Sequence, residues 1–174
     1  MEERKSLYKQ AAENGIPLGL YMSTISLMTI YADIVPFFSV IAIVLLFAGP
    51  VVIYRFQRKY FIEQGGMAEY AALWMLGIMM VIFGAIITGA VTYCVIEFVR
   101  PNYLYDQAQA TLDAYNALPE MRAKLGDMLD IMQAMVEQNA LPSAIELVFN
   151  MFWFVTFSGS VLSAITAAFA SRRL

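Results

Sequence analysis

The chain has 174 residues, of which 60% are hydrophobic and only 14% are charged, and its formal net charge is −3. Soluble domains carry about 25% charged residues, and a folded chain of this length leaves about 30% of its surface in water. So much apolar surface does not fit a soluble fold of this size, and we expect an integral membrane protein. The basic residues are scattered and outnumbered by acidic ones, which excludes a nucleic-acid-binding protein.

The residue types that most enzymes use are scarce. The sequence has no histidine, which removes the commonest metal ligand and the usual proton shuttle at neutral pH. The single cysteine, Cys94, lies inside an apolar run and is expected to pack as a small hydrophobic side chain. Neither a glycine-rich phosphate loop nor a Gly-x-Ser-x-Gly motif is present. We therefore expect no catalytic residue, no cofactor and no metal, and a protein that is not an enzyme.

Four stretches almost free of charge predict membrane-spanning helices, because about 20 apolar residues cross a bilayer. Residues 2–13 predict a short interfacial helix that ends at Asn14-Gly15-Ile16-Pro17, where the first span begins as a new helix. A polar connection is expected at 55–69, and Pro101 is expected to end the third span. The predicted fold is an all-α four-transmembrane-helix bundle, one membrane domain over 1–174, with spans at 15–32, 34–54, 70–98 and 144–170.

The only sizeable water-exposed segment is expected at 102–143, where Pro119 divides two helical stretches. In the second stretch apolar residues recur every three or four positions and draw one face of a helix: Met121, Leu125, Met128, Leu129, Met132, Met135 and Val136. This face needs the membrane surface, the neighbouring helix or a partner protein to cover it. Cu(I) binding by the methionines is an alternative, although no cysteine or histidine accompanies them. Ser143 and Glu146 fit a capping box before the fourth span.

The distribution of basic residues predicts the orientation. Four spans place both termini on one side, and eight of the 11 basic residues share it: Arg4, Lys5, Lys9, Arg55, Arg58, Lys59, Arg172 and Arg173. The positive-inside bias then predicts cytoplasmic termini, with the acidic segment 102–143 on the opposite side of the membrane. Arg55, Arg58 and Lys59 could meet anionic lipid headgroups of the inner leaflet, but we attribute them to this ordinary topogenic role.

Small residues predict where the spans pack, because helices in lipid associate by close contact. The third span has Gly77, Gly84, Ala85, Thr88 and Gly89, and the fourth has Thr156, Ser158, Gly159, Ser160, Ser163 and Ala167. We expect these two stripes to face each other within the bundle, or one of them to face a second copy of the chain.

Ionisable groups near a membrane core are costly and are therefore candidates for function. Four ionisable residues fall near the predicted outer boundary: Asp33, Glu97, Arg100 and Glu146. The amide residue Asn150 neighbours Glu146 on the fourth span and completes the candidate cluster. As a functional cluster they predict an outward-facing polar pocket that grips an ion or a lipid headgroup. The alternative is that these side chains have a purely structural role, pairing with their neighbours and extending their charged ends to the membrane interface.

The layout resembles the bacterial family known as domain of unknown function 4199. The similarity covers nearly the whole chain and lies in Asn14-Gly15-Ile16-Pro17-Leu18-Gly19 at the first span and Tyr54-Arg55 after the second. The similarity extends to Gly65-Gly66 before the third span, to Pro101 after that span and to the methionine-containing outer helix. The resemblance implies a small inner-membrane protein with four spans and no established activity. It also implies an accessory role beside polyprenyl-phosphate glycosyltransferases in envelope glycan synthesis.

Two functions remain open from the sequence. The first is a non-enzymatic accessory or scaffold subunit that binds a partner membrane protein, favoured by the missing catalytic groups and the outer amphipathic helix. The alternative is a small transporter or lipid-binding protein that uses Asp33, Glu97 and Glu146 at an outer acidic cavity. No internal repeat relates the two halves of the chain, and the predicted midplane lacks charge, so the first is preferred.

Overall fold

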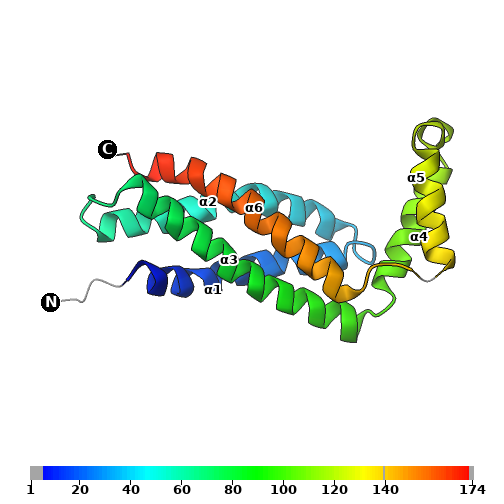
Figure 1. Cartoon of the computed structure of the whole chain (residues 1–174), viewed down its shortest axis with the longest axis horizontal. Coiled ribbons are helices and arrows are strands. Elements are labelled where there is room, and N and C mark those ends of the chain that lie inside the picture. The colour runs from blue at the N-terminus through cyan, green and yellow to red at the C-terminus, as the bar shows by residue number, and fades with distance from the viewer. Residues whose placement is uncertain (1–5, 139, 173–174) are drawn as a thin grey trace. The chain divides into compact units, whose positions relative to one another are not determined.

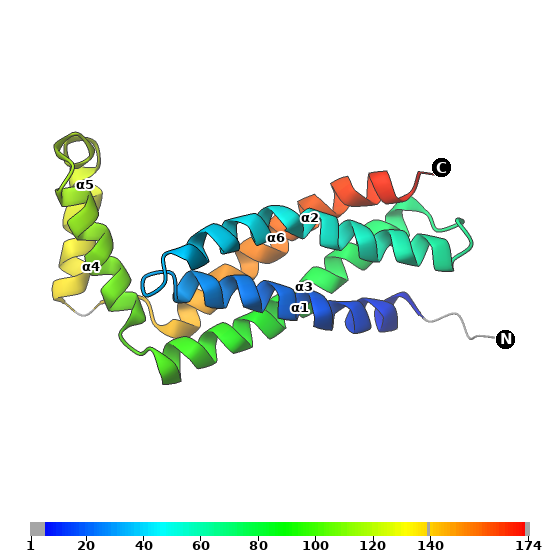
Figure 2. The ribbon, with the colours of Figure 1, turned by 180° about the vertical axis from the view of Figure 1, so that it is seen from behind.

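The computed structural model describes residues 6–138 and 140–172, with only the backbone described for 119–124. All regular secondary structure in this part of the chain is helical, which confirms the all-α class (Figure 1, Figure 2). In chain order the elements are α1 (Leu7–Ile30), α2 (Phe37–Glu63), α3 (Tyr70–Cys94), a π-helix (Val95–Val99), α4 (Tyr103–Asn116), α5 (Pro119–Glu137) and α6 (Ala144–Ala170). The chain forms two compact units. The first holds α1, α2 and most of α3 and α6, and the second is Tyr93–Val148.

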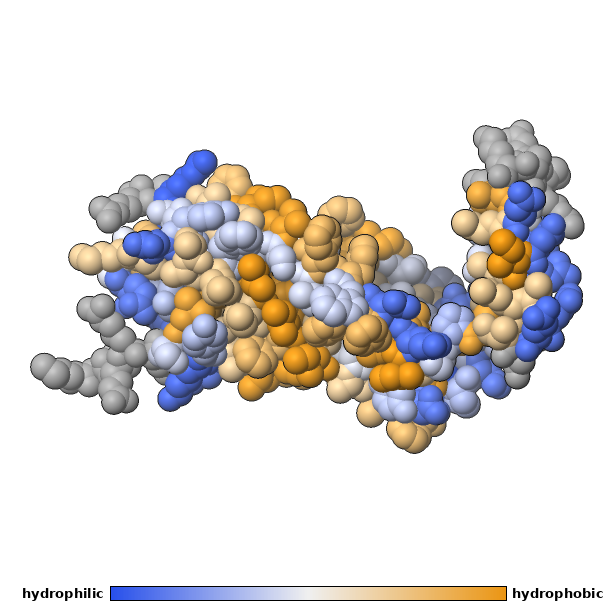
Figure 3. All heavy atoms as spheres, in the orientation of Figure 1, coloured by the Kyte–Doolittle hydropathy of each residue, from blue (hydrophilic) through white to orange (hydrophobic). Residues whose placement is uncertain are grey.

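Three helices are long and apolar enough to cross a membrane: α2, α3 together with the π-helix, and α6, with 27, 30 and 27 residues. Their large apolar side chains are turned outward, and Phe47, Phe154 and Phe157 are each exposed over more than 70% of their surface. Figure 3 shows apolar residues over the middle of the first unit and hydrophilic ones at the end where α6 finishes. This surface is compatible with a membrane protein. Among the described residues α1 does not meet the same criterion.

The predicted break in the first helix is wrong. Helix α1 runs without interruption through Asn14-Gly15-Ile16-Pro17, with the Ser6 hydroxyl accepting a hydrogen bond from the backbone N–H of Lys9 at its start. Packing explains the continuity: a Cβ added to Gly15 would lie 2.6 Å from the Cβ of Phe83 on α3. Such close tertiary contact overrides the local preference of a Gly-x-Pro sequence to end a helix.

The predicted polar connection at 55–69 is also wrong in its first half. Helix α2 continues to Glu63, and the turn to α3 contains Gly65 and Gly66, which both have positive φ angles, 68° and 73°. Residues 55–63 stay helical because Gln57, Tyr60 and Phe61 are buried against the other helices of the first unit. A stretch with charged residues on one face and buried residues on the other is an amphipathic helix rather than a loop.

Three predicted helix boundaries are confirmed, one at the end of a helix and two at the start. Helical structure ends at Val99, two residues before Pro101. Pro119 stands at the first position of α5, where its missing N–H costs nothing. The capping box before α6 forms as predicted, with the Ser143 N–H donating to a Glu146 carboxylate oxygen at 2.8 Å.

The small residues pack helices closely, but with a different pairing from the predicted one. A Cβ on Gly77 would lie 2.6 Å from the Ser163 Oγ, and one on Gly159 would lie 2.5 Å from Val81, so α3 and α6 do meet along part of the predicted stripes. Farther along α3, Gly84 and Thr88 pack on α1 instead, where the Thr88 hydroxyl donates to the Gly19 carbonyl at 3.2 Å. Helix α3 therefore divides its small residues between two neighbours.

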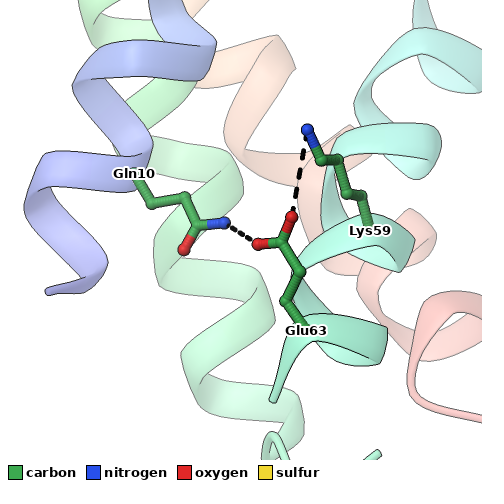
Figure 4. Close-up of polar contacts among 3 residues, drawn as sticks. All are labelled: Gln10, Lys59 and Glu63. Carbon is green, nitrogen blue, oxygen red and sulfur yellow. Dashed lines mark hydrogen bonds and ion pairs between the residues drawn. The ribbon is translucent and has the colours of Figure 1, made fainter. Parts of the chain in front are cut away.

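Polar side chains tie the helices of the first unit together. Gln57 of α2 is fully buried, and its amide Nε2 donates to the carbonyls of Leu73 on α3 and Ser163 on α6, each at 3.1 Å. At the same end, Gln10 of α1 donates to the Glu63 carboxylate, which lies 3.9 Å from the Lys59 ammonium (Figure 4). Interhelical hydrogen bonds of this kind stabilise helix association in lipid.

The second unit contains a helical hairpin. Helices α4 and α5 lie side by side (Figure 1, Figure 2). Leu112 is the buried residue of α4, and Leu129 is buried on α5. The neighbouring helix therefore covers part of the predicted apolar face of α5.

Candidate functional site

A cavity of about 640 Å³ lies in the second unit, between the π-helix, the first turn of α4 and the segment that precedes α6. Two carboxylate residues, Glu97 and Asp106, line it together with Asn102, Tyr105 and Ser143. The remaining wall is apolar and comes from Ile96, Pro101, Leu104, Leu141, Pro142 and Ala144. Of the residues in the predicted outer cluster, Glu97 lines this cavity.

The π-helix positions Glu97. Its wider turn is closed by the hydrogen bond from the Arg100 N–H to the Val95 carbonyl, 2.9 Å long. Within this turn Ile96 is buried at 2% exposure while Glu97 is exposed at the cavity wall. Single π-turns joined to an α-helix are frequent at functional sites.

Glu146 has a different role from the one predicted for the cluster. Its carboxylate accepts hydrogen bonds from the backbone N–H and the hydroxyl of Ser143, at 2.8 and 3.0 Å. Ser143 in turn lines the cavity. Glu146 thus caps the N-terminus of α6 and, through Ser143, fixes one wall of the cavity. That Glu146 itself binds a ligand stays a prediction.

The other predicted residues lie in different places. Asp33 is exposed in the turn between α1 and α2, where its carboxylate accepts the Ile34 N–H at 2.9 Å. The Arg100 guanidinium carbon lies 5.4 Å from the centre of the Tyr103 ring. Asp33 and Asn150 belong to the first unit, whereas Glu97, Arg100 and Glu146 belong to the second. A cluster of all five residues therefore stays a prediction, and the cavity holds Glu97.

Sequence reasoning missed Asp106, Asn102 and Tyr105. All three lie at the start of α4, directly after Pro101. The sequence signal there is only that of a turn before a new helix, because proline and asparagine are both favoured in turns. An acidic residue in the first turn of a helix is also favoured by the helix dipole, so Asp106 does not by itself indicate a site.

The lining is suited to hydrogen bonding and cation binding. Two carboxylates, an amide and a phenol offer acceptors to an ammonium group or to sugar hydroxyls. Among the described residues no group of three or more acidic, histidine or cysteine side chains is placed to hold a metal ion. The Met121 side chain lies outside the described residues, and of the other methionines proposed for Cu(I), Met128 and Met135 are exposed.

A family model described as Protein of unknown function (DUF4199) matches residues 13–172, and the chain belongs to this family. The resemblance predicted from the sequence is thereby confirmed. No curated protein and no solved structure matches the chain.

Proposed function

We propose that this chain, as a member of a family whose function is unknown, is a non-enzymatic accessory subunit of the bacterial inner membrane. In this proposal it has four spans and cytoplasmic termini, and α4 and α5 lie outside the cytoplasm. The subunit binds a second membrane protein through the exposed apolar side of α5. A polyprenyl-phosphate glycosyltransferase, the partner implied by the resemblance, is the class we would test first.

The arrangement of the first unit supports four spans. The start of α1, the turn between α2 and α3 and the end of α6 lie at the same end of this unit (Figure 1). This end carries Lys9, Arg55, Arg58, Lys59 and Arg172, while Arg4, Lys5 and Arg173 lie outside the described residues. In α1 the uncharged part, Gly15–Ile30, is about 24 Å long and packs lengthwise on α3. The positive-inside bias then assigns the basic end to the cytoplasm.

An apolar stripe on α5 carries the proposal of a partner. Met128, Ile131 and Met135 occupy one side of this helix and are 65%, 60% and 42% exposed. They are not the residues that face α4, whose contact buries Leu129. A row of exposed, flexible thioethers and a branched side chain is typical of a surface that another helix covers. Asp127 and Asp130, both exposed on the same helix, favour a partner helix with basic residues at its edge.

Site-specific photocrosslinking in cells tests this proposal. A benzophenone amino acid replaces Ile131, and the matched control carries it at Gln133, which is exposed on the same helix but outside the apolar stripe. One protein crosslinked from position 131 and not from 133 supports the proposal. Crosslinks to lipid alone, or to no protein at all, would overturn it, since the stripe would then lie on the membrane surface or be uncovered.

The acidic cavity of the second unit favours a second candidate function, a lipid-binding protein or transporter. Its carboxylates, Glu97 and Asp106, suit a headgroup that carries an ammonium or several hydroxyls. Native mass spectrometry of the purified protein would measure the retained lipids in wild type and in Glu97→Gln and Asp106→Asn variants. Loss of one lipid class in both variants supports this function, and unchanged retention removes its basis.

A further inference from the structure

A second hollow, of about 450 Å³, lies in the first unit between α2 and α6, and we call it the α2–α6 groove. Its apolar part comes from Pro50, Val51, Ile165 and Phe169, and its polar part from Tyr54, Arg58, Thr166 and Arg172. From Pro50 to Arg58 the groove follows α2 for about 12 Å. It therefore has an apolar section and a cationic end.

The apolar section faces outward on two helices that are apolar enough to cross a membrane. Val51, Ile165 and Phe169 are each about half exposed, so the groove is open along the side of the unit and not only at its end. In a bilayer such a surface is in contact with acyl chains. A small soluble anion would leave this section unfilled.

The protein fixes Arg58 at the cationic end. Its Nη1 group donates to the carbonyls of Ala170 and Arg172, at 2.9 and 2.8 Å, and its guanidinium carbon lies 5.1 Å from the centre of the Phe61 ring. These contacts occupy one edge of the guanidinium group. The N–H groups of Nε and Nη2 have no acceptor among the described residues.

A second cationic residue, Arg172, lines the same groove. The Arg172 guanidinium carbon lies 5.0 Å from the Phe169 ring, which forms part of the groove wall. No carboxylate of the described residues pairs with either arginine, whereas nearby Glu63 pairs with Lys59. Two guanidinium groups that line one groove, with no carboxylate partner among the described residues, favour an anion. Phosphate oxygens match the planar fork of arginine.

We propose that the α2–α6 groove binds one anionic phospholipid. Its phosphate accepts hydrogen bonds from Arg58 and Arg172, and an acyl chain lies along Val51, Ile165 and Phe169. Tyr54, one helical turn before Arg58 on α2, lines the groove and would meet the glycerol ester region. This site differs from the general attraction of basic residues to a charged membrane, because it requires a fixed arginine and the apolar section of the α2–α6 groove. It is independent of the partner surface on α5.

The proposal is tested on the full chain in detergent by native mass spectrometry, with phosphatidylglycerol titrated against phosphatidylcholine. Arg172→Gln removes one cation and leaves the Arg172 carbonyl that accepts from Arg58. Arg55→Gln is the matched control, because Arg55 is exposed on the same helix as Arg58 but does not line the groove. We expect Arg172→Gln to weaken phosphatidylglycerol binding about tenfold, as the loss of a charge-assisted hydrogen bond does. Arg55→Gln should leave it within about twofold.

A third variant tests the apolar section. Ile165→Trp adds a large ring to the groove wall without altering any charge, and it should weaken phosphatidylglycerol binding while the Arg58 contacts remain. The unfolding midpoint of Ile165→Trp is measured in parallel to show that this variant is folded. If Arg172→Gln lowers the yield of folded protein, Ile165→Trp still tests the proposal.

Three results would overturn the proposal. Equal losses in Arg55→Gln and Arg172→Gln would show general charge attraction. Unchanged binding in Ile165→Trp would show that no acyl chain lies in the groove. Displacement of the lipid by millimolar inorganic phosphate would show that the arginines bind a soluble anion and not a lipid.

Discussion

Replacing Gly77 by alanine tests how the first unit is held together. Gly77 is buried on α3, and a Cβ at this position would lie 2.6 Å from the Gln57 Nε2 and 2.6 Å from the Ser163 Oγ. Neither distance is compatible with a methyl group, so the alanine side chain must displace the amide, the hydroxyl or α6 itself. The substitution therefore acts at the point where α2, α3 and α6 meet.

The magnitude follows from two opposing effects. Alanine is favoured over glycine in a helix by about 1 kcal/mol. Overpacking a close contact costs about 1–3 kcal/mol. Moving Gln57 also weakens its hydrogen bonds to the Leu73 and Ser163 carbonyls, and interhelical hydrogen bonds in bilayers contribute about 0.6 kcal/mol each. We expect a net destabilisation of about 2 kcal/mol.

The assay is reversible unfolding of the purified protein in mixed micelles, with a double-mutant cycle as the control. Ser163→Gly removes the side chain that the new methyl group would meet, so in the Gly77→Ala background it should recover about half of the lost stability. In the wild-type background the same change should destabilise, because glycine weakens α6.

The reasoning would be refuted in either of two ways. Gly77→Ala could leave the unfolding free energy unchanged or raise it, which would mean that α3 and α6 do not approach closely at Gly77. Alternatively, Ser163→Gly could add its full cost to that of Gly77→Ala, which would show that the two positions are not in contact.

Three further substitutions have defined outcomes. Ser143→Ala should remove the cap of α6 and speed amide hydrogen exchange in its first turn about fivefold, without affecting the end of the helix at Ala170; equal exchange in both proteins would contradict the capping role. Gly65→Ala should lower the free energy of unfolding by about 1–2 kcal/mol in the same micelle assay, because φ is 68° there and no atom would clash with the new Cβ; an unchanged value would exclude backbone strain as the reason for glycine. Lys59→Gln should change the unfolding free energy by less than about 0.5 kcal/mol, since the Lys59–Glu63 pair is 3.9 Å long and solvent-exposed; a loss several times larger would show that Lys59 does more than pair with Glu63.

Local chemistry in the sequence was sufficient for several elements. The excess of apolar residues predicted a helical membrane protein, and membership of the family followed from short marks along nearly the whole chain. Pro101, Pro119 and the Ser143–Glu146 pair predicted where helices end and begin. These features were predictable because a proline or a capping side chain acts on backbone groups within one turn of itself.

The candidate site was predictable only in part. Glu97 was identified because an ionisable residue at the end of an apolar helix is unusual. Asp106 and Asn102 were not, because a polar residue at the start of a helix is common and gains its meaning only from the cavity it lines. The sequence predicted two roles for Glu146: its role in the capping box is confirmed, and its place in the binding cluster stays a prediction.

The remaining features were decided by contacts between residues far apart in the chain. The sequence determined the membrane character, the helical class and the local helix ends, since these depend on composition and on neighbours within a few residues. Only the tertiary structure decided that α1 continues through Pro17, where Gly15 packs on Phe83, and that Gln57 is buried instead of lying in a loop. It alone placed Arg58 against the end of α6, more than a hundred residues away. The physical reason is that close packing and buried hydrogen bonds outweigh local preference, and no short stretch of sequence contains both members of such a contact.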